Sequence, residues 1–184
     1  MNNFLVSIII PTFNRYELAK GSIENAILQN YSNIEVIVVE DGSSSGIEDY
    51  IIKLNNNKII YHRHSEKKGL GAARNTGTKI ARGKYVAFLD DDDRWLKEKI
   101  SSQIHLLKNL DDNSIMIYCG TCTINNHRVL YEDIPQNRGV MMDFIFKGFT
   151  LPPSCMLINK ESLISIGGHS EELISCIDHD LWMK

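Results

Sequence analysis

The chain has 184 residues, of which 43% are hydrophobic and 23% are charged, and its formal net charge is −3. This length suits one domain with a sizeable core, and the composition is that of an ordinary globular protein. A slightly negative net charge does not favour binding to a phosphate backbone, so we expect no nucleic-acid partner. No apolar run approaches the roughly 20 residues of a membrane-spanning helix, and the N-terminus lacks the pattern of a signal peptide, so we expect a cytoplasmic location.

The first 110 residues alternate between β-branched apolar runs and segments with helical spacing. Strands are predicted at 6–10, 34–39, 58–62 and 85–89, and helices at 18–27, 47–54, 70–81 and 96–110. This alternation predicts right-handed crossovers and a mostly parallel α/β sheet with helices on both faces. We expect a nucleotide-binding half at about 1–110.

The regular alternation of predicted strands and helices stops near residue 115. A hairpin is predicted over 115–131, then a helix at 141–147, a strand at 155–158 and a helix at 160–166. We expect this smaller, mixed part, at about 111–184, to form the acceptor side of a single domain. The last helix begins near residue 177 without a closing signal, so we expect the natural protein to continue.

Four cysteines lie at positions 119, 122, 155 and 176. The spacing of Cys119 and Cys122 invites a metal or redox interpretation, but residues three apart on a strand point to opposite faces. No second Cys or His pair completes a zinc set. We therefore predict reduced cysteines in the core.

Three polar segments follow predicted strands, where ligands bind in open parallel sheets. They are the segment from Pro11 to Arg15, the Glu40-Asp41 pair, and the run Asp90 to Asp93. Four adjacent carboxylates repel one another unless a cation or solvent neutralises them. Asp93 is predicted to cap the next helix. Asp91 and Asp92 suit an all-oxygen site for Mg²⁺ or Mn²⁺ together with diphosphate oxygens.

Other candidates have two interpretations each. Asp41 can bind a nucleobase or ribose, or close a turn. The segment from Gly69 to Arg74 partly matches a dinucleotide fingerprint but lacks its third glycine, so we expect its glycines to let the loop approach a ligand instead. Arg74 can face a phosphate or form a salt bridge. Asp178 and Asp180 stand at the start of the final helix, where acids also complement the helix dipole.

Taken together, these segments resemble the family 2 glycosyltransferases with the GT-A fold. The resemblance rests on five strings in order: SIIIPTFNR, VIVVEDGSSSG, GLGAARNTGTKIARGKYVAFLDDDD, LPPSCMLINKESLISIGG and DHDLW. The chain departs from the family at Ile177, where Glu is frequent, and at His169, where an aromatic residue often follows Gly-Gly.

The resemblance implies a role for each of these positions. Pro11, Thr12, Phe13 and Asp41 would line a pocket for a nucleoside diphosphate, commonly UDP. Asp91 would be the acid on the ribose side, Asp92 the metal ligand and Asp178 the general base.

The implied reaction moves a sugar, with inversion, from a UDP-sugar to a hydroxyl group. The acceptor would be a saccharide or a lipid-linked saccharide, as in surface polysaccharide synthesis. A peripheral membrane contact would come from a region beyond residue 184. Two alternatives stay open: a non-catalytic nucleotide-sugar-binding module, and a sugar nucleotidyltransferase, although the latter should have a Gly-rich basic loop after the first strand.

Overall fold

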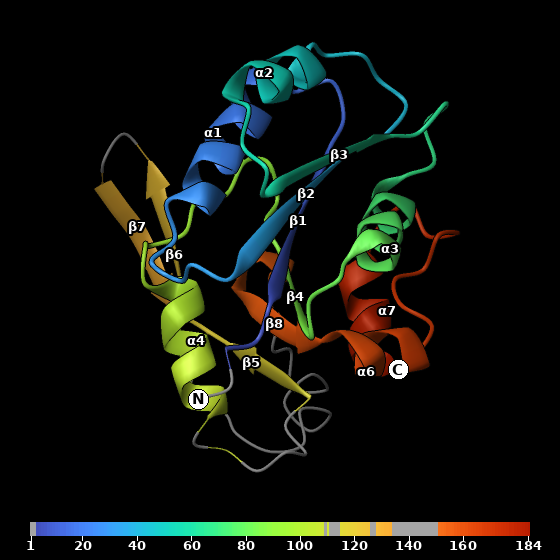
Figure 1. Ribbon diagram of the computed structural model, residues 1–184. Helices are drawn as coiled ribbons and strands as arrows, with labels where there is room; N and C mark the ends of the chain where they lie inside the picture. The colour runs from blue at the N-terminus through green and yellow to red at the C-terminus, as the bar shows by residue number, and fades with distance from the viewer. Residues whose placement is uncertain (1–2, 109, 111–114, 126–127, 134–150) are drawn as a thin grey trace.

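The computed structural model describes residues 3–108, 110, 115–125, 128–133 and 151–184 (Figure 1). Its strands are β1 (Val6–Thr12), β2 (Ile34–Glu40), β3 (Ile59–Arg63), β4 (Tyr85–Phe88), β5 (Met116–Tyr118), β6 (Thr121–Asn125), β7 (Arg128–Asp133) and β8 (Met156–Asn159). Its helices are α1 (Tyr16–Ile27), α2 (Ile47–Leu54), α3 (Leu70–Ile80), α4 (Lys99–Leu107), the 3₁₀ turn η1 (Pro153–Cys155), α6 (Lys160–Ser165) and α7 (Ile177–Met183).

A six-stranded sheet in the order β3-β2-β1-β4-β8-β5 forms the centre of the fold. Strands β3, β2, β1 and β4 run parallel, while β8 is antiparallel to both β4 and β5. The prediction of a mostly parallel sheet is therefore confirmed. Because β5 and β8 join the same sheet as β1 to β4, both halves of the chain contribute to it.

The two faces of the sheet bury different residues of the same strands. Ile8 and Ile10 face a core shared with α1, α2 and α4, whereas Ile9 faces a core shared with α3, α6 and α7. Figure 1 shows these two groups of helices on opposite sides of the sheet. All seven residues of β1 are buried, as expected of a parallel strand in a sheet with helices on both faces. Each buried Ile side chain contributes about 1.5–3 kcal/mol.

Strand β1 is longer than expected, since it continues through Pro11 to Thr12. Pro11 pairs in register with Val39 of β2 on one side. The pairing with β4 ends nearby, with the amide of Leu89 donating to the Ile9 carbonyl at 2.9 Å. A proline is tolerated here because no ladder hydrogen bond to β4 requires its missing N–H.

The helix expected over 96–110 is shorter, since α4 begins at Lys99, and Asp93 does not cap it. Leu96, assigned to its apolar face, is 82% exposed. Trp95 instead lies in a loop held by tertiary hydrogen bonds. Its indole Nε1 donates to the Ser154 carbonyl at 2.7 Å, and its amide donates to Asn25 Oδ1 at 2.8 Å. These contacts outweigh the local helical pattern.

The hairpin expected over 115–131 is only partly right: β6 pairs with β7, whereas the first residues of that range form β5, which pairs with β8 in the central sheet because its apolar side chains find the core there. The predicted helix over 141–147 lies outside the described residues. The cysteine prediction is right for Cys155, which is buried, but wrong for Cys122 and Cys176, which are exposed. Cys122 lies on the β6–β7 hairpin, whose described residues are mostly exposed.

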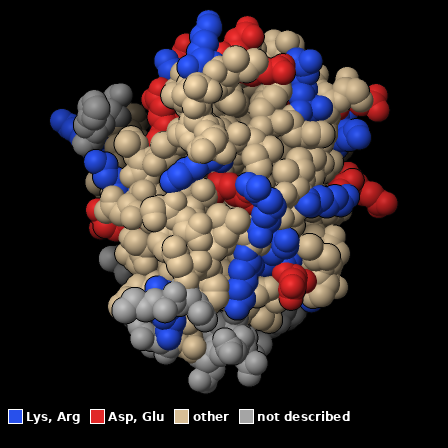
Figure 2. Space-filling model, in the orientation of Figure 1, with Lys and Arg blue, Asp and Glu red and all other residues tan. Residues whose placement is uncertain are grey.

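Charged side chains of both signs share the face shown in Figure 2. Lys and Arg form a band through its middle, with acidic side chains beside it. No helix within the described ranges has the length and apolar character needed to cross a membrane.

Candidate active site at the carboxyl edge of the sheet

Thr12, the last residue of β1, joins the ends of the two neighbouring strands. Its backbone carbonyl accepts the amide of Asp41, which follows β2, at 2.9 Å. Its Oγ1 donates to Asp91 Oδ2, beyond β4, at 2.8 Å. The structure therefore brings together three of the residues expected to bind nucleotide, as the shared edge of parallel strands requires.

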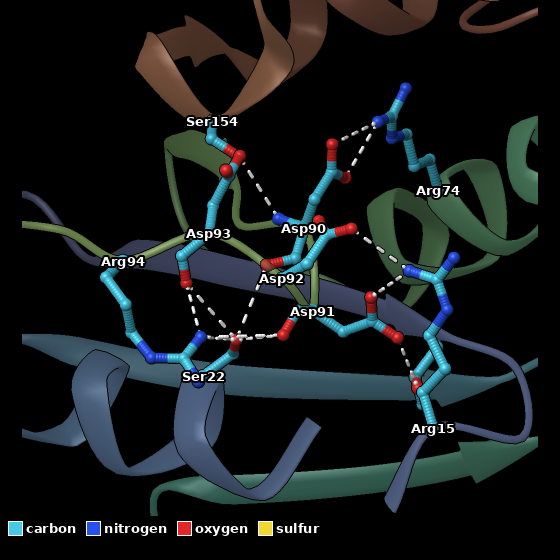
Figure 3. Close-up of polar contacts among 10 residues, drawn as sticks. Arg15, Ser22, Arg74, Asp90, Asp91, Asp92, Asp93, Arg94 and Ser154 are labelled. Carbon is cyan, nitrogen blue, oxygen red and sulfur yellow. Dashed lines mark hydrogen bonds and ion pairs between the residues drawn. The ribbon is translucent and has the colours of Figure 1, made fainter. Parts of the chain in front are cut away.

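The backbone of the aspartate run is held from α1. Ser22, buried in α1, donates from Oγ to the Asp91 carbonyl at 2.8 Å. Arg94 Nη1 donates to the carbonyl of Asp93 at 2.6 Å and to Ser22 Oγ at 2.8 Å (Figure 3). These bonds hold the backbone of the turn in place from α1.

Ser154, in η1, anchors the run from the other side. Its Oγ accepts the amide of Asp90 at 3.1 Å. It also hydrogen-bonds the carboxyl group of Asp93. Burial raises the pKa of Asp93, and the bond to Ser154 offsets part of this effect. Asp93 therefore ties the run to η1 instead of capping a helix.

Asp91 and Asp92 share one arginine. Arg15 Nη1 lies 3.0 Å from Asp91 Oδ1 and 3.1 Å from Asp92 Oδ2. The Asp91 side chain is 7% exposed, whereas that of Asp92 is 57% exposed. Burial raises the pKa of Asp91, the bonds from Thr12 and Arg15 lower it, and the neighbouring charge of Asp92 raises it again. Asp92 is thus the more accessible of the two carboxylates.

Arg74 lies at the centre of a second ion-pair group. From α3 its Nη2 lies 2.8 Å from Asp90 Oδ1, and its Nη1 lies 2.7 Å from Asp178 Oδ1. The Arg74 side chain is 1% exposed and lies 5.8 Å from the ring centre of Phe88. Of the two interpretations left open for Arg74, the structure shows the salt bridge. This bridge connects the end of β4 with the first turn of α7.

Helix α7 is held by its apolar residues. Leu181 is buried and Trp182 is partly buried in the core that includes Ile9. Asp180 pairs with Lys184, one turn later, at 2.7 Å. Asp178 is therefore the acid of this helix that points to the aspartate run.

The segment after Gly167 packs tightly on α3. The Asn75 amide holds the backbone of His169 through two bonds of 2.9 Å each. A Cβ on Gly71 would lie only 2.1 Å from the Ser170 carbonyl oxygen. The expectation that this glycine lets a loop approach a ligand is wrong, because its space is taken by the protein's own backbone.

Asp41 organises the loop that precedes α3. Its Oδ1 lies 2.8 Å from His64 Nδ1 and accepts the Lys68 amide at 2.8 Å, while Oδ2 accepts the Gly69 amide at 2.8 Å. Burial raises the pKa of Asp41, but these bonds outweigh it and hold the pKa below its ordinary value. A carboxylate offers about four acceptor positions, so Oδ2 keeps one for a further donor.

Phe13 and Pro11 differ in exposure. Phe13 is 41% exposed, and Lys67 Nζ lies 4.4 Å above its ring. Pro11 is buried within β1. Of the two residues expected to line the pocket, Phe13 is therefore the accessible one, whereas Pro11 is enclosed in the strand.

The described residues contain no group of three or more His, Cys, Asp or Glu side chains placed to hold a metal ion. A cation at this edge would need ligands from elsewhere. One exposed carboxylate plus diphosphate oxygens is a donor set that Mg²⁺ and related cations accept. Asp92, half-exposed beside Asp91, fits that requirement.

Asp90, His64 and Ser154 were not singled out from the sequence. Asp90 stands first in the aspartate run, so its position was the available signal. His64 and Ser154 carry no local signal, since their partners lie 23 and 64 residues away.

Comparison with known proteins agrees with this geometry. Residues 7–167 match the family described as "Glycosyl transferase family 2". The chain is 34% identical over 191 residues to the uncharacterized glycosyltransferase RP339 of Rickettsia prowazekii, covering 98% of this chain and 58% of that protein. It is 43% identical over 104 residues to Escherichia coli WfaP, named a UDP-Glc:alpha-D-GlcNAc-diphosphoundecaprenol beta-1,3-glucosyltransferase, covering 56% of this chain and 41% of that protein.

Solved structures share the fold at lower identity. Staphylococcus aureus TarS in complex with UDP-GlcNAc has a TM-score of 0.79 at 23% identity, covering 97% of this chain and 52% of that one. The Pyrobaculum calidifontis mannosyltransferase PcManGT, in complex with GDP-Man and Mn²⁺, has a TM-score of 0.73 at 17% identity. The match covers 98% of this chain and 51% of that one. The α/β fold is thus that of GT-A glycosyltransferases.

The chain belongs to glycosyl transferase family 2. It spans little more than half of RP339 and less than half of WfaP.

Proposed function

We propose that this chain is the catalytic region of an inverting glycosyltransferase that moves a sugar from UDP to a hydroxyl of a saccharide or lipid-linked acceptor. The observation that carries the proposal is the Arg74 bridge. One buried guanidinium joins Asp90, at the edge where the nucleotide would bind, to Asp178, on the helix of the acceptor half. A donor site and a base are thereby held at a common point.

The nucleoside would bind between the ends of β1 and β2. Asp41 has one acceptor position left, which suits the imide N–H of a uracil ring. The exposed ring of Phe13 and the side of Thr12 would complete this pocket, with Asp91 toward the ribose. WfaP, which shares 43% identity over 104 residues, is named for a UDP-Glc donor, and this supports UDP as the nucleotide.

Asp178 would act as the general base. Its side chain is 37% exposed, so an acceptor hydroxyl can reach it, while Arg74 fixes its Oδ1. The carboxylate takes the hydroxyl proton as the oxygen attacks the anomeric carbon. The bond from that carbon to the diphosphate oxygen breaks, and the diphosphate leaves with the electron pair. Attack opposite the leaving group inverts the anomeric centre.

A Mn²⁺ or Mg²⁺ ion held by Asp92 and the diphosphate would neutralise charge on the leaving group. The half-exposed Asp92 supports this assignment, as does the Mn²⁺ in the PcManGT complex. Asp91, which is buried and bonded to Thr12, would stay in place as a fixed neighbour of the ion.

The name of one relative supports the acceptor class. WfaP is named for a lipid-linked GlcNAc diphosphate acceptor. We therefore propose a lipid-linked saccharide as the acceptor, in polysaccharide synthesis.

Calorimetry with UDP tests the nucleotide and cation assignments. UDP should bind at least about ten-fold more tightly in Mn²⁺ than in EDTA, and Asp92→Asn should remove most of this difference. Asp41→Ala should weaken uridine and UDP alike by about 5- to 100-fold, because a nucleoside contact is lost. Equal UDP affinity with and without Mn²⁺ would contradict the cation site, and binding without turnover of any UDP-sugar would favour a non-catalytic module.

A further inference from the structure

Arg15 lies between the carboxylates of Asp91 and Asp92 at the carboxyl edge of the sheet. A single nitrogen, Nη1, lies within 3.1 Å of an oxygen of both Asp91 and Asp92 (Figure 3). These two oxygens are therefore separated by a cation of the protein itself. Without that charge, two adjacent carboxylates, one of them buried, would repel each other at short range.

The arginines labelled in Figure 3 differ in their contacts and in their exposure. Arg94 donates to backbone carbonyls and to Ser22, so it supports the turn. Arg74 is 1% exposed and buried against Phe88. Arg15 is 52% exposed, and among the described residues its guanidinium hydrogen-bonds to the carboxylates of Asp91 and Asp92.

The Arg15 side chain can leave without disturbing the backbone. Arg15 stands at the N-terminal cap of α1, where its carbonyl accepts the Ala19 amide at 3.0 Å, and its side chain makes no capping bond. Thr12 holds Asp91 Oδ2 independently at 2.8 Å. Releasing the guanidinium thus requires rotation of an exposed side chain and leaves Asp91 in position.

We propose that Arg15 is an exchangeable counter-ion, which neutralises Asp91 and Asp92 in the cation-free protein and withdraws when a divalent cation binds with the nucleotide diphosphate. This inference rests on the proposed function, because it takes the cation site at Asp92 as given. A guanidinium and a divalent cation held by the same pair of carboxylates repel each other, so binding of the ion at Asp92 favours departure of the guanidinium. The displaced guanidinium then pairs with the diphosphate, for which its forked donors are suited.

The exchange has a measurable consequence. Arg15 competes with a free cation but assists a cation that arrives with diphosphate. It therefore contributes to the coupling between the two ligands, and this coupling is the same whichever ligand binds first.

The test measures Mn²⁺ binding to the 184-residue chain by calorimetry, with and without UDP. Arg15→Met should raise the affinity of the nucleotide-free protein for Mn²⁺ by about ten-fold and shrink the gain in Mn²⁺ affinity that UDP produces in the wild type. Arg15→Lys, which keeps the charge, should stay close to the wild type. Arg15→Gln is the second neutral variant should the Met form fail to fold.

Arg63→Met is the matched control. Arg63 is also about half-exposed and pairs with one carboxylate, Glu48 at 3.6 Å, so the change in net charge is identical. Its Mn²⁺ affinity should equal that of the wild type.

The outcomes separate the two ideas. If UDP and Mn²⁺ bind but Arg15→Met and Arg15→Gln leave the affinity for free Mn²⁺ unchanged or lower it, the exchange is wrong and the proposed function stands. If Arg63→Met raises Mn²⁺ affinity as much as Arg15→Met does, the effect is one of net charge and the exchange is again wrong. If no folded protein binds UDP or Mn²⁺, the proposed function fails and the exchange fails with it.

Discussion

Two arginines each bridge a pair of aspartates at the same edge of the sheet, and they differ chiefly in burial. Arg15 joins Asp91 and Asp92 from a side chain that is 52% exposed. Arg74 joins Asp90 and Asp178 from a side chain that is 1% exposed. Their distances to carboxylate oxygens, between 2.7 and 3.1 Å, are similar.

Burial decides what each bridge can do. An exposed arginine is rehydrated when it leaves, so its ion pairs cost little to break. A buried arginine cannot leave without stranding a charge in the core. The structure thus places an exposed positive charge beside Asp91 and Asp92 and a buried one between the aspartate run and α7. Four substitutions, given from the largest expected effect to the smallest, test this contrast.

The largest effect is expected for Asp178→Asn. Asparagine keeps an oxygen for Arg74 but cannot accept a proton from the acceptor. In an active form, turnover should fall by about 10²- to 10⁴-fold. UDP affinity should change by less than about two-fold, because the base makes no nucleotide contact. Asp180→Asn is the control, and greater loss in that variant than in Asp178→Asn would move the base to Asp180.

Arg74→Met should lower the free energy of unfolding by about 3 kcal/mol, because it leaves Asp90 and Asp178 without their shared cation. Arg15→Met should lower it by at most about 1 kcal/mol, since its bridge is half-exposed. Urea unfolding followed by circular dichroism gives both values. Equal losses would show that burial does not distinguish the two bridges.

His169, close to Arg74, is expected to have a smaller, pH-dependent effect on the free energy of unfolding. Both of its ring nitrogens lack a hydrogen-bond partner among the described residues, and its ring packs edge-on against Phe88 at 4.9 Å. Burial first, and then the nearby charges of Arg74 and Lys184, lowers its pKa to about 3.

The sign of the resulting effect follows from this lowered pKa. An unfolded histidine binds a proton below about pH 6.5, whereas the folded one stays neutral. The unfolded state therefore takes up more protons as the pH falls, and stability is lost from about pH 6.5 downward. Between pH 7 and 5 this loss amounts to at most about 2 kcal/mol.

His169→Phe should remove that loss while keeping the ring contact. Thermal unfolding at pH 7, 6 and 5 measures it, with His62→Phe, a change at an exposed histidine, as the control. If His169→Phe and the wild type lose stability in parallel over this range, the folded protein binds a proton at His169 after all.

The structure bears on where the predicted site residues lie, and less on what each of them does. The carboxyl-edge cluster was foreseen because parallel strands deliver their following residues to one edge, and Thr12 indeed joins Asp41 and Asp91 there. The roles of Asp41, Asp92 and Asp178 in binding and catalysis remain predictions. The salt-bridge interpretation of Arg74 could not be chosen over the phosphate one, since its second partner lies 104 residues away.

Local pattern by itself determined the alternating strands and helices of the first half and the mostly parallel sheet, because β-branched runs and helical spacing act within a few residues. It also placed the acids at strand ends. Tertiary contacts alone decided that α4 begins only at Lys99, after the loop in which Trp95 bonds to Ser154. They also decided that Gly71 admits the backbone of Ser170, and that Arg15 and Arg74 pair with different members of the aspartate run. Those outcomes depend on burial and on partners far apart in the chain, and neither is encoded in the spacing of neighbouring residues.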